Sequence, residues 1–183
     1  FGVSANAMIS YKYGMTANDK ITLEAQFSTG DGNDAADKSV GSVITGNVWG
    51  SPTGIYSSHK ALLLFPDPQV VNRYYSAVHD ISNMGLGVTA GFLSVMKDFI
   101  PNKLSGKIGL AAVSNVKPKG GSSFIGSEIN AEVKYNIKVF LTLGLSAGYC
   151  MLGDFYNAPS VTYNKLRPKD PWVIFTSLSW LMF

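Results

Sequence analysis

The side chains best placed to do chemistry are charged residues on the polar side of alternating segments. They are Lys12, Lys20, Glu24, Lys103, Lys107, Glu128, Glu132, Lys134 and Lys138. Apolar residues occupy the positions between them, the period at which a β-strand sends side chains to opposite faces. Such a face, richer in lysine than in glutamate, predicts a water-filled passage with a slight preference for anions. The alternative is that these charges pair across strands and fill a narrow, plugged interior.

A second group of polar residues consists of oxygen ligands close together in the sequence. These are Asp31, Asn33 and Asp34, with Asp37 nearby. Calcium prefers such ligands, but the spacing of an EF-hand and its bidentate glutamate are absent. Turn formation explains Gly, Asn and Asp equally well. We therefore expect no metal site and no cofactor.

The two histidines, His59 and His79, are the remaining candidates for catalysis. Ser57 or Ser58 with His59 and Asp67 supplies the residue types of a hydrolase triad. A triad is defined by geometry, and no nucleophile-elbow motif surrounds these serines. We therefore do not expect an enzyme.

The elements that must position these groups are long strands. In 20–28, Ile21, Leu23, Ala25 and Phe27 separate completely from the polar residues between them. Comparable segments are 1–13, 84–99 (where the phase blurs), 103–112, 125–135, 138–151 and 172–183. Most exceed the roughly 5–6 residues of an average strand and reach the roughly 9–11 residues of a tilted membrane-crossing strand.

Composition also favours a membrane protein. The 183 residues are 46% hydrophobic and 15% charged, whereas a soluble domain carries about 25% charge. No run approaches the roughly 20 apolar residues of a spanning helix, so a membrane protein of this sequence must be a closed barrel. The net charge of +3 is scattered, which argues against nucleic-acid binding. The single cysteine, Cys150, is expected to be a small buried residue.

Short and long connections alternate along the chain. Short turns are expected at 14–18, 100–102 and 136–137, and long loops at 29–83, 115–124 and 153–171. Bacterial barrels have short periplasmic turns and long external loops. We therefore predict an all-β, transmembrane, antiparallel up-and-down β-barrel as a single domain over 1–183. In it 29–83 is a long extracellular loop region and the C-terminus is periplasmic.

The predicted strand number is odd, whereas bacterial barrels have even numbers. We therefore expect these seven strands to be the C-terminal part of a larger barrel; an eighth strand at 39–49 is the alternative. The apolar run 61–65 lies inside the longest loop. It is expected to enter the lumen as a constriction, to cap the barrel as a short helix, or to contact a partner.

The last twelve residues resemble the C-terminal signal of outer-membrane proteins, which ends in an aromatic residue preceded by alternating hydrophobic residues. Phe183, Leu181, Phe175 and Val173 fit this pattern, with Trp180 beside them, whereas two serines at 177 and 179 do not. The resemblance implies recognition by the barrel-assembly machinery, with Trp180, Leu181 and Phe183 as the signal.

A narrower resemblance is to porins of the alginate-export type. It rests on Asn-Asp-Lys-Ile-Thr-Leu-Glu at 18–24 with Thr-Gly-Asp at 29–31, on Glu-Ile-Asn-Ala-Glu at 128–132, on Gly-Asp-Phe-Tyr at 153–156, and on Arg-Pro-Lys-Asp-Pro-Trp at 167–172. The resemblance implies a monomeric barrel that passes anionic polysaccharide. The mixed charge of the predicted lumen does not require such a polymer, so the substrate is not carried over.

These observations predict an outer-membrane porin or channel for passive passage or export of small polar or anionic solutes. Its partners would be outer-membrane lipid, the assembly machinery and an envelope partner at the external loops. The alternative is a structural barrel that anchors or binds a partner in an envelope complex. A soluble β-sandwich is the third class.

Overall fold

The computed structural model describes residues 1–31, 41–42, 61–65, 85–118, 120–163 and 166–181. These residues form seven strands: β1 (Ser4–Lys12), β2 (Lys20–Ser28), β3 (Val88–Ile100), β4 (Leu104–Asn115), β5 (Phe124–Lys138), β6 (Leu141–Leu152) and β7 (Trp172–Trp180). Two short helical turns, η2 (Asp154–Asn157) and α2 (Pro159–Thr162), precede β7. The predicted all-β class is confirmed. The alternative strand at 39–49 lies outside the described residues, apart from 41–42.

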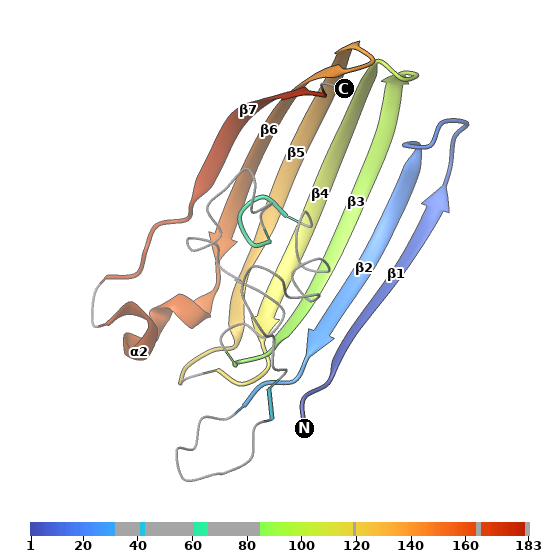
Figure 1. Ribbon diagram of the computed structural model, residues 1–183. Helices are drawn as coiled ribbons and strands as arrows, with labels where there is room; N and C mark the ends of the chain where they lie inside the picture. Colours follow the sequence, from blue (N-terminus) through green and yellow to red (C-terminus); the bar gives the residue numbers. More distant parts are fainter. Residues whose placement is uncertain (32–40, 43–60, 66–84, 119, 164–165, 182–183) are drawn as a thin grey trace.

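The seven strands form one antiparallel sheet in sequence order, each paired with the next (Figure 1). This confirms the predicted up-and-down arrangement. Residues 13–19, 101–103 and 139–140 connect strands at one end of the sheet, and the longer connections start and finish at the other end. Within the described ranges, no helix is long and apolar enough to cross a membrane.

The alternation in the sequence becomes two faces of this sheet. We call the face against which segment 61–65 lies the inner face, and the opposite one the outer face. On β2, Glu24, Gln26 and Ser28 are buried on the inner face, whereas Leu23 and Phe27 are exposed on the outer face. The complete segregation of these residue types keeps the register, because a slip by one residue would exchange the two faces.

The outer face carries rows of apolar side chains that cross every strand. One row consists of successive cross-strand partners: Ile9, Leu23, Leu93, Leu110, Ile129, Tyr149 and Trp172. Their side chains are 39% to 70% exposed. The neighbouring row is Tyr11, Ile21, Val95, Ile108, Ala131, Ala147 and Ile174. A contiguous apolar surface of this extent is rare on a soluble monomer.

The turn between β5 and β6 lies later than predicted. Val139 and Phe140 form it, rather than residues 136–137. Asn136 is still inside the ladder, where its side chain donates to Asn102 O and accepts from the Thr142 hydroxyl. Ile137 is the extra residue of a bulge. Asn136 therefore continues the strand, and its polar side chain is hydrogen-bonded to neighbouring residues.

The blurred phase of β3 also has a structural cause. Val88, Ala90 and Phe92 are buried on the inner face, whereas Leu93 and Val95 are exposed on the outer face. The inner face is thus apolar at the long-loop end of β3, where segment 61–65 covers it. The alternation therefore blurs because segment 61–65 gives the inner face of β3 apolar neighbours at this end.

Candidate functional site

The inner face is the candidate functional site, because it gathers most of the predicted polar side chains. Lys12 and Lys20 are cross-strand partners beside the turn 13–19. Glu24 is buried on β2 and accepts a hydrogen bond of 2.7 Å from Asn6 Nδ2. The lysines therefore lie at the short-turn end, as the sequence predicted, with the glutamate further along the strand.

An ion pair crosses β4 and β5 on this face. Lys107 Nζ lies 2.7 Å from Glu132 Oε1, and both side chains are about one-fifth exposed. Lys134 follows on the same side of β5 and has no carboxylate partner among the described residues. The charge of Lys107 is thus largely matched by Glu132, and Lys134 leaves a net positive charge beside the pair.

A hollow of about 680 Å³ adjoins these charges. Most of its lining residues are polar and come from β3 to β7, and Ala61 and Leu62 also line it. The lining residues are Ala61, Leu62, Met96, Ser105, Gly106, Lys107, Glu132, Lys134, Asn136, Thr142, Gly144, Ser146, Phe175, Ser177 and Ser179. Hydroxyl groups and small residues line it because β6 and β7 place serine, threonine and glycine at their inner positions. A hollow of this size has room for water and small polar solutes.

Segment 61–65 bounds this hollow and is bound to β5 through Glu128. The Glu128 carboxylate accepts three backbone hydrogen bonds, from Leu62 N at 2.6 Å, Leu63 N at 2.9 Å and Leu64 N at 2.8 Å. Asn130 Nδ2 donates a fourth, of 2.8 Å. Glu128 is 1% exposed, so these donors replace the water that the charge has lost.

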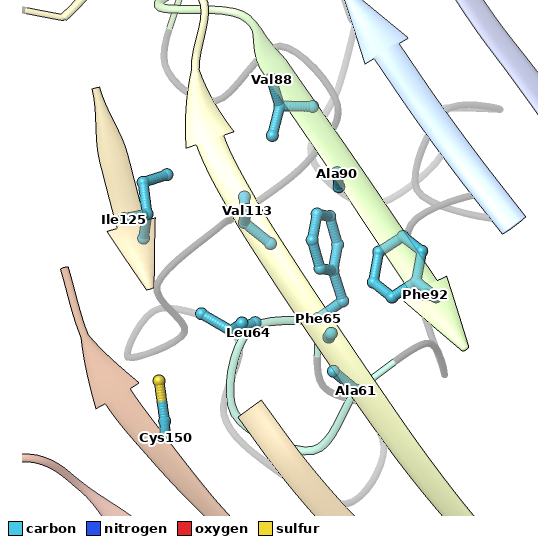
Figure 2. Close-up of a cluster of buried hydrophobic side chains, with 10 residues drawn as sticks. Ala61, Leu64, Phe65, Val88, Ala90, Phe92, Val113, Ile125 and Cys150 are labelled. Carbon is cyan, nitrogen blue, oxygen red and sulfur yellow. The ribbon is translucent and has the colours of Figure 1, made fainter. Parts of the chain in front are cut away.

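Apolar contacts hold the same segment on its other side (Figure 2). Leu64 and Phe65 are buried against β3, β4 and β6. The Phe65 and Phe92 rings meet edge to face, with centroids 5.1 Å apart. A bulge between β4 and β5 leaves Ile125 without a cross-strand partner, and its side chain is buried in the same cluster. The segment therefore packs on the sheet and is not helical, so the predicted alternative of a short helical cap is wrong for residues 61–65.

Tyr156 of η2 packs at the edge of this cluster, near the long-loop end. Burial raises the pKa of its phenol to about 12, and the neighbouring Cys150 adds to this effect. Tyr156 is therefore neutral at physiological pH and acts as a packing residue.

Two of the predicted inner residues lie elsewhere. Lys103 belongs to the turn 101–103, and its Nζ lies 5.7 Å from the centroid of the Tyr135 ring, which is on the outer face. Lys138 pairs with Leu141, whose own partner is Trp180 of the outer face. The bulge at Ile137 shifts Lys138 by one position and so reverses its side. Both lysines lie at the short-turn rim.

The remaining predicted residues do not join this site. Trp180 and Leu181 are exposed at the short-turn end of β7 and beyond it, with Trp180 on the outer face. Asp31 Oδ2 accepts a hydrogen bond from Gly41 N. Phe183, Asn33, Asp34, Asp37, Ser57, Ser58, His59, Asp67 and His79 lie outside the described residues. Among the described residues, no group of three acidic, histidine or cysteine side chains converges as a metal site would.

In β7, the hydrophobic positions of the predicted terminal signal are offset by one residue from those on the apolar outer face. Val173 and Phe175 match it in sequence, yet their partners Gly148 and Ser146 lie on the inner face. The exposed apolar residues on the outer face of β7 are Trp172, Ile174, Leu178 and Trp180. The alternate hydrophobic positions of the signal therefore do not coincide with the apolar outer face over β7.

The contacts of Glu128 could not be predicted from the sequence. Its donors are backbone N–H groups of Leu62 to Leu64, which carry no sequence signature. The one available signal was an apolar run followed by Pro66-Asp67-Pro68 inside a long loop. Asn130, two residues from Glu128 and on the same face, was part of the alternation but was not singled out.

Comparison with known protein families, with curated proteins and with solved structures finds no match for this chain.

Proposed function

We propose that this chain forms part of a transmembrane β-barrel of the bacterial outer membrane and lines a water-filled passage. The observation that carries the proposal is the contrast between the two faces of one sheet. Apolar rows cross all seven strands on the outer face, where lipid would cover them. The opposite face holds an ion pair, buried polar groups and a hollow lined mainly by polar residues. This contrast is typical of outer-membrane barrels.

The strand lengths and connections agree with this proposal. β3 to β6 have 12 to 15 residues, more than the roughly 9–11 that a tilted membrane strand needs. In the proposed orientation the short turns are periplasmic and the long connections are external. β1 and β7 are the edges of the seven-stranded sheet. Lipid cannot satisfy an open edge, so the proposed barrel closes through further strands.

The charge of the hollow supports passage of small polar or anionic solutes. Lys107 and Glu132 largely neutralise each other, whereas Lys134, which has no carboxylate partner in the described part of the chain, adds a positive charge to the same lining. Charged side chains at a narrow point determine which ions pass. The passage should therefore conduct chloride better than potassium. The sequence resemblance to porins supports the same class.

Planar lipid bilayers test this proposal with the complete protein. A channel should produce discrete current steps, and a salt gradient should give a reversal potential on the anion-selective side. Current steps that discriminate neither ion would remove the proposed preference. An absence of conductance from correctly folded protein would contradict the passage itself.

One observation favours a second function, that of a structural barrel that binds a partner. Segment 61–65 and its apolar cluster fill the inner face at the long-loop end, and a filled barrel serves as an anchor rather than a channel. The same bilayer recording distinguishes the two functions. An anchor conducts no current, yet it still inserts into lipid and remains with membranes on extraction.

A further inference from the structure

The backbone of segment 61–65 is bound by the side chain of Glu128, while apolar contacts of Leu64 and Phe65 hold its other side. Three successive backbone N–H groups, of Leu62, Leu63 and Leu64, point to the carboxylate of Glu128. Successive N–H groups of this kind form an anion-binding concavity. Hydrogen bonds to an ionised carboxylate are roughly twice as strong as neutral ones. The sheet therefore supplies the anion, and the segment supplies the donors.

The position of the segment gives this attachment a consequence for transport. Ala61 and Leu62 form part of the wall of the polar hollow. Leu62 lines the hollow together with Lys134 and reaches β6, where a Cβ atom at Gly148 would contact its side chain at 3.3 Å. The segment, together with the strands, therefore limits the cross-section of the proposed passage.

We infer that Glu128 is a positioning residue that latches segment 61–65 against β5 and β6, and that the latched segment sets the width of the passage. This inference rests on the proposed channel function. Glu132, two residues from Asn130 on the same strand, is engaged with Lys107 and does not share this role. The latch is therefore specific to one carboxylate.

Glu128→Gln tests the latch with little change of volume. Glutamine removes the charge and places an amide donor against backbone donors, so at least one hydrogen bond is lost. A hydrogen bond to a charged group contributes enough to change an equilibrium about tenfold or more. The segment should be released correspondingly more often, which would appear as a higher mean conductance with larger current fluctuations. Asp154→Asn is the matched control, because it removes one exposed carboxylate that bonds only locally to Asn157 among the described residues.

A reversible cross-link tests whether Glu128 affects conductance through the position of the segment or through its own charge. A Cβ atom at Gly148 would lie 3.4 Å from Leu62 Cβ, close to the roughly 3.5–4.5 Å of a disulfide. Leu62→Cys with Gly148→Cys, in a Cys150→Ser background, should therefore form a disulfide that fixes the segment. In the oxidised protein, Glu128→Gln should then leave conductance unchanged. After reduction, the same substitution should raise it.

The outcomes separate the latch from the channel. Equal conductance of wild type, Glu128→Gln and Asp154→Asn would overturn the latch, as would a Glu128→Gln effect that survives the disulfide. If no variant conducts, the channel proposal fails. Labelling of Leu62→Cys by a water-soluble maleimide then decides the latch on its own. Labelling about tenfold faster in the Glu128→Gln background supports it, and equal rates overturn it.

Discussion

Replacing Leu110 with arginine would place a charge near the middle of the outer face. Leu110 is six residues from the short-turn end of β4 (Leu104–Asn115), and its partners are Leu93 and Ile129. A rise of about 3.4 Å per residue and a tilt of about 35–45° put it roughly 15 Å above Leu104 along the membrane normal. That is about the centre of an apolar band of roughly 25 Å.

The expected cost depends on what covers this face. An arginine at the bilayer midplane of a barrel destabilises folding by about 2–4 kcal/mol, which is roughly a 30- to 900-fold change in the equilibrium constant. Leu110 is already 48% exposed. In water, a substitution at such a surface position would change stability by only about 0.5 kcal/mol. The two environments therefore predict costs that differ by more than the error of the measurement.

Denaturant titration of the protein in phospholipid vesicles measures this cost as a shift of the midpoint at constant slope. Leu104→Arg is the matched control, because it makes the same change on the same face at the membrane rim. There the expected cost is about 0–1 kcal/mol. Equal and small costs at both positions would refute the lipid-facing assignment of the outer face.

Three further predictions concern other parts of the protein. Gly109→Ala should destabilise the sheet, because its Cβ would collide with Asn130 Oδ1; in a double-mutant cycle with Asn130→Ala, denaturant titration should show a coupling of about 0.5–3 kcal/mol, whereas additivity would exclude the contact. The Asp98 backbone N–H, with Thr16 and Lys97, holds the pKa of Asp19 below its ordinary 3.8, so its stabilisation is complete above about pH 4 and is lost as the pH falls through the folded-state pKa. Acid titration of Asp19→Asn should lack that loss, and an unchanged acid transition would contradict the role of Asp19. Lys134→Glu should move the reversal potential in a salt gradient toward cation selectivity, and an unmoved potential would show that Lys134 does not face the ions.

The strands could be predicted from the sequence because apolar and polar residues alternate along them. In β2 each apolar residue faces outward and each polar one inward, so Leu23 and Glu24 alone define the two faces. Two of the three short connections were equally visible, since Gly14 and Pro101 lie in their turns. The sequence pattern was sufficient wherever the side chains around a residue in space share its polarity.

The predictions failed where a backbone irregularity, or a segment distant in the sequence, determines on which face a residue lies or what it contacts. The bulge at Ile137 reverses the side of Lys138, and alternation cannot reveal an unpaired residue inside a strand. Val88 and Phe92 are apolar on the inner face because Phe65, distant in the sequence, packs on them. Glu128 was identified as an inner residue, but its partners are backbone amides. Such long-range contacts depend on the path of the chain rather than on local residue types.

The proposed membrane protein requires that lipid covers the outer face and water reaches the inner one. Single cysteines along β5, in a Cys150→Ser background, test it when each carries a fluorophore in vesicles. Labels at Ile129, Ala131 and Val133 should be quenched by lipid-attached quenchers, and labels at Glu132 and Lys134 by aqueous iodide. This alternation with a period of two is the predicted result. Equal quenching by iodide at every position would contradict the claim.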